Sequence, residues 1–284
     1  MPSGIFSMPP EEYYKSSGVS QSALQWLIQS PAYYKWRLEN PVEPTASMKL
    51  GTAVHMAILE PEKFATAYIA LPEGDGRTKE VKDARAAVIA QNPGAEFLSA
   101  SDYLACQEIS VAVNDHSQAG QLLGFSRLHS IEQSMYWVDA KTDLLCKGRV
   151  DGIIPAESTI IDLKTCRSAL PREFERSAFS LGYHIQAAYY VDGYAALTNS
   201  LPKFYFIVVE REAPYQTIVY QADDNFLEYG RREYRTLLEL YKHCTETNSW
   251  PGPAWNDDLG SYEVLPLSIP NWAPYLDKPR MEVV

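Results

Sequence analysis

The sequence predicts an α/β fold with a central mixed β-sheet and helices on both faces of that sheet. Between residues 130 and 164, apolar residues occur in three short β-rich runs that are separated by turn residues. Before and after this region, apolar residues recur at the 3.6-residue spacing of amphipathic helices. Strand-rich and helix-rich segments combined in this way pack as a sheet covered by helices.

Composition indicates an ordinary globular protein. The chain has 284 residues, of which 46% are hydrophobic and 12% aromatic. No apolar run approaches the roughly 20 residues of a membrane helix, and the first residues lack the order of a signal peptide. We therefore expect a cytoplasmic protein with no membrane contact. The four cysteines contain no C-x-x-C pair, which argues against a zinc ribbon or an iron–sulfur cluster.

The first hundred residues are expected to form an arm, two helices and an insertion. Residues 1–18 are rich in Pro, Ser and Tyr and predict an extended N-terminal arm. Ser20 can cap a helix over 20–28, which Pro31 ends or restarts. A second helix is expected over 46–60. The Gly- and Pro-containing stretch 70–97, with a short charged helical segment, predicts a flap or insertion.

The remaining elements follow from the change of period along the chain. A longer helix is expected over about 101–122, followed by strands with period-two or continuous apolar patterns and then by further helices. The expected strands are 130–138, 144–154, 159–164, 203–210 and 215–221, with turns at 139–143 and 155–158; the expected helices are 171–181, 184–197 and 223–246. From Trp250 the chain has six prolines and little periodicity. We therefore expect one domain over 19–249 and a Pro-rich C-terminal arm, 250–284, packed on it.

Charged residues within one apolar run point to metal-dependent phosphodiester chemistry. Asp162 and Lys164 interrupt the run Ile160-Ile-Asp-Leu-Lys164, and period two places both side chains on one strand face. Asp151 ends the preceding apolar run and is followed by Gly152. Carboxylates suit hard divalent cations, which neutralise a phosphate and activate water. The alternative is a structural ion pair between Asp162 and Lys164.

Two further helices carry candidate residues. His55 lies on the mostly apolar helix 46–60, where a neutral imidazole can complete a metal shell or simply belong to the core. Gln186 and Tyr190 lie four residues apart, on one face of the helix over 184–197. Packing is the alternative explanation for this pair.

The charge balance limits how the chain can contact DNA. The net charge is −11, whereas Lys and Arg contacts to phosphates usually dominate non-specific DNA affinity. Any DNA contact must therefore be local. A basic set is expected around the centre, although each member can equally be ordinary surface charge: Lys141, Lys147, Arg149, Lys164, Arg167 and Arg172.

The order of these motifs resembles a known superfamily. The chain contains Gly51-Thr-Ala-Val-His55, Gly148-Arg-Val-Asp151, Ile161-Asp-Leu-Lys-Thr165 and Gln186-x-x-x-Tyr190, in that order. This arrangement resembles the PD-(D/E)xK nucleases of the RecB-like branch and, more closely, the nuclease domains of RecE-type exonuclease VIII, over about residues 18–275. The resemblance implies a restriction-endonuclease-like core. Val150 stands where the motif name has proline.

The resemblance also implies roles for individual residues. His55, Asp151 and Asp162, with the carbonyl of Leu163, would bind Mg²⁺, for which Mn²⁺ can substitute. Lys164 would position or activate the attacking water, and Gln186 and Tyr190 would contact the DNA backbone or support the metal ligands. Residues expected to support the ligands or to contact DNA are Glu132, Arg149, Thr165 and Arg167.

The function implied by the resemblance is a double-stranded DNA exonuclease. Such an enzyme would digest the 5′-terminated strand from DNA ends and leave 3′ single-stranded tails for a strand-annealing protein. Members of the family form homo-oligomeric rings. Two alternatives remain: a structure-specific or single-strand endonuclease of the same superfamily, and a non-catalytic scaffold on the same fold.

Overall fold

The structure is a computed structural model that describes residues 2–256 and 258–270, with the side chains of residues 125–129 excepted. Its centre is one mixed sheet in the order β1-β5-β6-β7-β8-β9, and β2 pairs with β6 beside that path. The strands are β1 (Gly4–Ser7), β2 (Val19–Ser20), β5 (Ile131–Val138), β6 (Leu145–Ile154), β7 (Thr159–Cys166), β8 (Lys203–Glu210) and β9 (Thr217–Gln221). The pairs β7–β8 and β2–β6 are parallel and the others antiparallel, so the predicted mixed sheet is confirmed.

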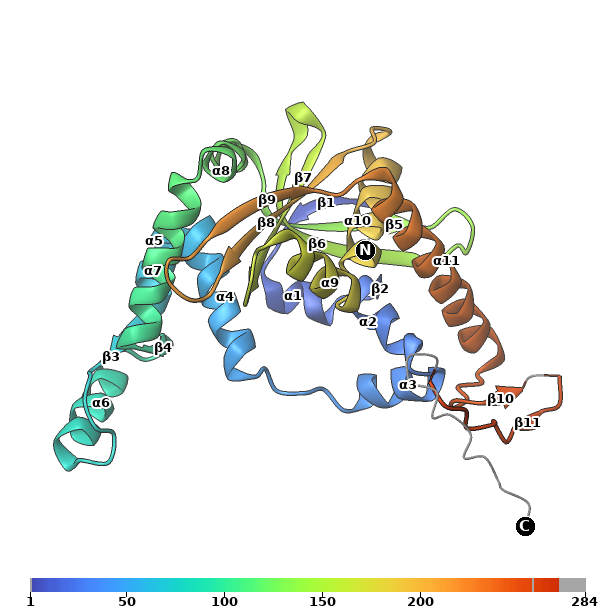
Figure 1. Ribbon diagram of the computed structural model, residues 1–284, viewed down its shortest axis with the longest axis horizontal. Coiled ribbons are helices and arrows are strands. Elements are labelled where there is room, and N and C mark those ends of the chain that lie inside the picture. Colours follow the sequence, from blue (N-terminus) through green and yellow to red (C-terminus); the bar gives the residue numbers. More distant parts are fainter. Residues whose placement is uncertain (1, 257, 271–284) are drawn as a thin grey trace, which may run out of the picture.

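Helices cover both faces of the sheet, as predicted (Figure 1). Period two explains the two layers, because in β7 Ile160 belongs to one buried cluster whereas Ile161 and Leu163 belong to the other. The first cluster is covered by α2 (Gln21–Leu24), the 3₁₀ helix η1 (Gln25–Ile28), α9 (Pro171–Ser180), α10 (Tyr183–Thr198) and α11 (Asp224–Thr247). The second is covered by α4 (Ala46–Leu59), α5 (Pro61–Ala67), α7 (Ala100–Asp115) and α8 (Ser117–His129).

The N-terminal segment is part of the sheet, which corrects the prediction of an extended arm over 1–18. β1 pairs antiparallel with β5, from Gly4↔Tyr136 to Ser7↔Gln133, and the short helix α1 (Pro10–Lys15) follows. A four-residue edge strand is too short to show a clear alternating pattern, which explains the error. The helix expected over 20–28 is also divided, into α2 and η1, and α3 (Pro31–Glu39) restarts at the proline.

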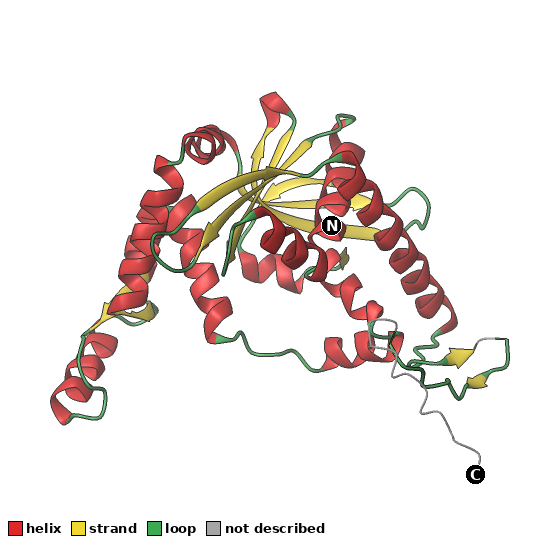
Figure 2. Cartoon of the chain, viewed as in Figure 1, coloured by secondary structure: helices red, strands yellow, loops and turns green. Residues whose placement is uncertain are grey.

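The stretch expected as a flap over 70–97 has its own small sheet. β3 (Tyr68–Leu71) and β4 (Glu96–Ser99) pair in parallel and are connected by α6 (Lys79–Gln91). Figures 1 and 2 show this β-α-β unit projecting at the end of α7 that lies away from the sheet. The helix expected over 101–122 is two helices, because His116 adopts an extended conformation and its Nδ1 accepts the Ala119 amide at 3.2 Å.

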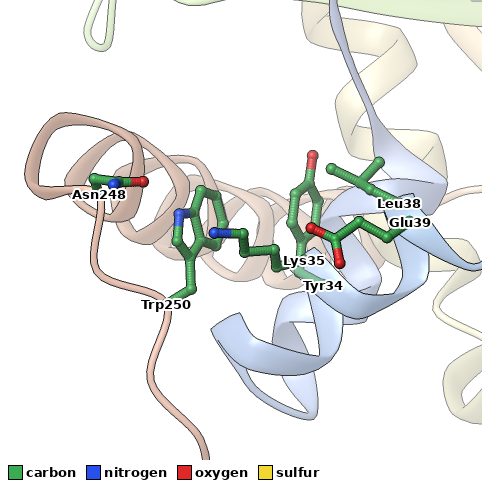
Figure 3. A pocket seen from close by; sticks show the side chains of 6 residues that line it. All are labelled: Tyr34, Lys35, Leu38, Glu39, Asn248 and Trp250. Atoms are coloured by element: carbon green, nitrogen blue, oxygen red, sulfur yellow. The ribbon is translucent and has the colours of Figure 1, made fainter.

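In the described part of the C-terminal arm, packing on the domain is seen at its beginning. Trp250 stacks on Tyr34 with a centroid separation of 5.4 Å, and Figure 3 shows both rings beside a surface pocket of about 290 Å³. A short hairpin of β10 (Trp255–Asn256) and β11 (Ser261–Tyr262) follows. Beyond it, the side chains of residues 263–270 are exposed, and residues 271–284 of the expected arm lie outside the described part. Among the described residues, no helix combines the length and apolarity needed to cross a membrane.

The close contact between α10 and α11 gives a stability prediction. Replacing a helical glycine with alanine usually stabilises a helix by about 1 kcal/mol. At Gly230 of α11, however, a Cβ atom would lie 1.9 Å from the His184 carbonyl oxygen of α10. We expect Gly230→Ala to lower the free energy of unfolding by about 1–3 kcal/mol, as measured by urea denaturation. Gly124→Ala is the control, since no described atom lies within 4 Å of its Cβ position, and equal effects of the two changes would contradict the packing argument.

Candidate functional site

The candidate site lies where β6 and β7 separate. Their pairing runs only from Ile154↔Thr159 to Gly152↔Ile161, and β2 pairs with β6 further along the same edge, at residues 146–147. Between these two pairings, no described strand is hydrogen-bonded to this edge of β6. The Leu163 amide instead donates to Asp151 Oδ2 at 2.6 Å. An aspartate side chain thus replaces a strand partner, and its carboxylate is held inside the sheet.

Three elements bring a cluster of possible metal ligands together at this point. His55 of α4, Glu132 of β5 and Asp151 of β6 each offer a ligand atom, and these atoms all lie within 4.8 Å of one another. His55 Nδ1 is 3.6 Å from Asp151 Oδ2. Two carboxylates and one imidazole are a donor set that divalent cations accept. The cluster contains the predicted ligands His55 and Asp151, and it adds Glu132, which was expected only to support them.

The predicted pairing of Asp162 with Lys164 on one strand face is present. Lys164 Nζ lies 2.5 Å from Asp162 Oδ2, and Gln186 Nε2 of α10 donates to Asp162 Oδ1 at 2.8 Å. Despite the short ionic contact, Oδ2 is fully buried and accepts no hydrogen bond of regular geometry from the described residues. Asp162 does not join the compact cluster of His55, Glu132 and Asp151. Its role as a metal ligand, like that of the Leu163 carbonyl, stays a prediction.

The electrostatics of the site favour an added positive charge. Burial raises the pKa of Asp162 to about 6, and the nearby Asp151 carboxylate adds to the increase although Lys164 opposes it. Burial also acts to raise the pKa of Asp151, but His55, Lys164 and the Leu163 amide outweigh it and the net shift is downward. Asp151 is therefore ionised at neutral pH. The buried carboxylates repel one another, and a bound cation would relieve that repulsion.

Lys164 is held in its charged form. Burial acts to lower the pKa of its ammonium group, but Asp162, Asp151 and Tyr183 together raise it above the ordinary value. The ammonium lies 4.6 Å from the centroid of the Tyr183 ring, a cation–π contact. Motif matching did not single out Tyr183. It lies three residues before Gln186 and seven before Tyr190, so helical periodicity places all three on one face of α10.

Tyr190 is buried and packs against β6, the strand that carries Asp151. Its hydroxyl interacts with the Gln186 side chain and with the backbone of Arg149. Its ring lies so close to β6 that a Cβ atom at Gly148 would be 2.7 Å from Tyr190 Cε1. The glycine of the Gly148-Arg-Val-Asp151 motif is thus required by the approach of this ring.

The other predicted residues lie on β6, on β7 and just beyond β7. Arg149 Nε donates to Glu132 Oε2 at 2.8 Å, and Thr165 Oγ1 is 4.0 Å from the position of a Cβ atom at Gly51 of α4. Arg167 is exposed one residue beyond β7.

The basic set expected around the centre does not form one surface, which corrects that prediction. Lys147 is buried, and its ammonium donates to the carbonyls of Tyr13 and Ser16 at 3.0 and 2.7 Å. Lys141 lies in the turn between β5 and β6, at the opposite end of the hairpin from Asp151. The sequence alone does not reveal that Lys147 is used internally, because its partners are backbone carbonyls of a distant segment.

Comparisons with known proteins agree with this fold. A crystal structure of a protein from Eubacterium rectale, described as a proposed exonuclease, superimposes with a TM-score of 0.59 at 14% sequence identity; the match covers 93% of this chain and 97% of that one. At this identity the likeness supports the fold alone. A search of curated proteins finds no match.

The family assignment comes from a sequence model. The model described as "PDDEXK-like domain of unknown function (DUF3799)" matches residues 20–258, which include every residue of the cluster and of the Asp162–Lys164 pair. The match covers most of the chain and begins at the strand β2 that borders the site. The chain therefore belongs to this PDDEXK-like family.

Proposed function

We propose that this protein is a metal-dependent deoxyribonuclease. The observation that carries the proposal is the meeting of His55, Glu132 and Asp151 in one cluster beside the buried Asp162–Lys164 pair. A structural ion pair would explain the contact between Asp162 and Lys164, but it would not explain the cluster of His55, Glu132 and Asp151. Clustered carboxylates are costly unless a cation or a proton compensates them.

The residues present fit a divalent cation such as Mg²⁺. His55, Glu132 and Asp151 would hold it, and the buried Oδ2 of Asp162 offers a further oxygen. When bound, the cation supplies neutralisation of phosphate charge and a lower pKa for the attacking water. Gln186 fixes the Asp162 carboxylate through Oδ1, which leaves Oδ2 directed toward Lys164.

Lys164 acts as a fixed positive charge. Its raised pKa keeps the amine protonated at neutral pH, so it donates hydrogen bonds rather than accepting a proton. A protonated amine beside the scissile phosphate orients the attacking water and stabilises the negative charge that develops on the phosphoryl oxygens. The Tyr183 ring and Asp162 hold the ammonium in place for this purpose.

For the substrate we propose the ends of double-stranded DNA. The resemblance to RecE-type exonuclease VIII supports digestion of the 5′-terminated strand and formation of 3′ tails, and the description of the Eubacterium rectale protein as a proposed exonuclease is consistent with it. On the same ground we propose a homo-oligomeric ring and transfer of the 3′ tail to a strand-annealing protein.

Loss of the charge of Lys164 or of Asp151 should strongly reduce cleavage. We expect Lys164→Ala and Asp151→Asn each to reduce the rate of DNA digestion about 100-fold or more, because each removes charge stabilisation in a buried site. The measurement is release of nucleotides from end-labelled duplex DNA in Mg²⁺. Lys141→Ala is the matched control, since this exposed lysine lies at the far end of the β5–β6 hairpin. Digestion by the Lys164→Ala variant at the normal rate would contradict the proposal.

The form of the DNA should separate exonuclease from endonuclease activity. We expect linear duplex to be digested, with loss of the 5′-end label before the 3′-end label, and covalently closed circles to remain intact. The reason is that an exonuclease requires a free end. Gel analysis of both substrates under identical conditions is the measurement. Cleavage of the closed circles would favour the endonuclease alternative, and early loss of the 3′ label would reverse the proposed polarity.

Metal binding should depend on the cluster even without DNA. We expect isothermal titration with Mn²⁺ to show binding by the wild-type protein and a loss of affinity of about 100-fold or more in Asp151→Asn. Removing a residue that only orients a metal ligand typically costs about 10–100-fold in affinity, and removing a direct ligand should cost more. Lys141→Ala should bind as the wild type does. Absence of Mn²⁺ binding by the wild-type protein would favour the alternative of a non-catalytic scaffold on the same fold.

A further inference from the structure

We propose that Arg149 is a positioning residue that holds Glu132 in the metal cluster and joins that ligand to the N-terminal segment, residues 4–16. The proposal rests on the metal-dependent function above. It assigns Arg149 to the interior of the site rather than to a DNA-contacting surface. Three sets of contacts carry it: those of Glu132, those of Arg149 and those of the N-terminal segment.

Glu132 lies in an unusual backbone conformation beside a like charge. The pairs Ile131↔Gly152 and Gln133↔Val150 flank it, so it lies opposite Asp151 on the neighbouring strand. Two carboxylates in this position repel each other. Its φ of 54° falls in the left-handed region, which glutamate seldom adopts. Such a conformation persists only where surrounding contacts enforce it, and it is typical of functional sites.

Arg149 supplies the contact that opposes this repulsion. Its Nε donates to Glu132 Oε2 at 2.8 Å, while one terminal nitrogen, Nη1, donates to Ser134 Oγ at 3.0 Å and to the Met8 carbonyl at 2.9 Å. The guanidinium is mostly buried, with 13% of the side chain exposed. A planar group with several fixed donors can bridge three acceptors in this way, whereas a lysine amine cannot reproduce the geometry. This geometry thus uses Nε and Nη1 of the side chain for contacts within the protein.

The Met8 carbonyl connects the metal cluster to the N-terminal segment. This segment comprises β1, which extends the sheet at β5, and α1. It is also anchored by Lys147, whose ammonium donates to Tyr13 and Ser16 without any described contact to Glu132. Lys147 and Arg149 lie two residues apart on β6, so both reach the segment from the same strand face. Among the hydrogen bonds of the described residues, only those of Arg149 link the segment to a ligand.

The two anchors permit a matched comparison in the full-length protein. We expect Arg149→Met to weaken Mn²⁺ binding about tenfold or more, in the range typical of residues that orient a metal ligand. Lys147→Met should lower the thermal midpoint but leave Mn²⁺ affinity within about twofold of wild type, because the Lys147 bonds reach Tyr13 and Ser16 and involve neither Glu132 nor the Met8 carbonyl. Arg149→Lys, which keeps the charge but not the bridge, should bind with intermediate affinity.

A double-mutant cycle tests whether Arg149 acts through Glu132. Glu132→Gln alone should weaken Mn²⁺ binding, and adding Arg149→Met to it should weaken binding little further, because the positioned carboxylate is already absent. In DNA digestion at saturating DNA, Arg149→Met should raise the Mn²⁺ concentration needed for half-maximal rate. When the DNA concentration is varied at saturating Mn²⁺, KM for DNA should stay near the wild-type value.

Several results would contradict the positioning role of Arg149. Unchanged Mn²⁺ affinity in Arg149→Met, or additive effects of the two substitutions, would overturn the positioning role. A raised KM for DNA with normal metal affinity would also overturn it and would make Arg149 a DNA contact. If the wild-type protein binds no Mn²⁺, the proposed metal-dependent function fails as well, and the positioning role fails with it.

Discussion

The separation of β6 from β7 is the constraint on which the site depends. Were the two strands paired along their full length, the backbone groups near Leu163 would be satisfied by β6 and the space would be closed. Because pairing ends at Gly152 and Ile161, the Asp151 carboxylate enters the gap and accepts the Leu163 amide. Unpaired backbone groups inside a protein are costly. The gap therefore requires a polar side chain. A carboxylate can accept a hydrogen bond from the backbone amide and also bind a cation.

Helix packing on the two faces of the sheet positions His55 and Gln186 beside this gap. The apolar side chains of α4, among them Val54 and Ile58, are buried on one face of the sheet, and this packing brings His55 to Asp151. On the other face α10 is buried along most of its length and presents Gln186 to Asp162. The site thus draws on two hydrophobic layers that meet at one opening in the sheet. Residues that never contact a substrate fix its geometry.

Simple periodicity was sufficient for the parts of the site that follow regular geometry. Period two placed Asp162 and Lys164 together, helical spacing paired Gln186 with Tyr190, and the strands from β5 to β9 were located within a few residues. The irregular parts were not accessible in this way. Glu132 joins the cluster through a left-handed backbone conformation, and Lys147 is satisfied by carbonyls of a distant segment. Neither feature leaves a spacing pattern, because each depends on tertiary contacts between segments far apart in the chain.

The distribution of basic side chains explains why Asp151 is the natural centre of a metal site. Of the three carboxylates of the site, Glu132 contacts Arg149 and Asp162 contacts Lys164, each at hydrogen-bonding distance. Asp151 has an amide and an imidazole as its neighbours, with no Lys or Arg side chain in ion-pair contact among the described residues. It nevertheless has a lowered pKa and stays ionised. Asp151 is therefore the carboxylate of the site that has no ion pair with Lys or Arg among the described residues. A divalent cation placed there would also reach the neighbouring His55 and Glu132.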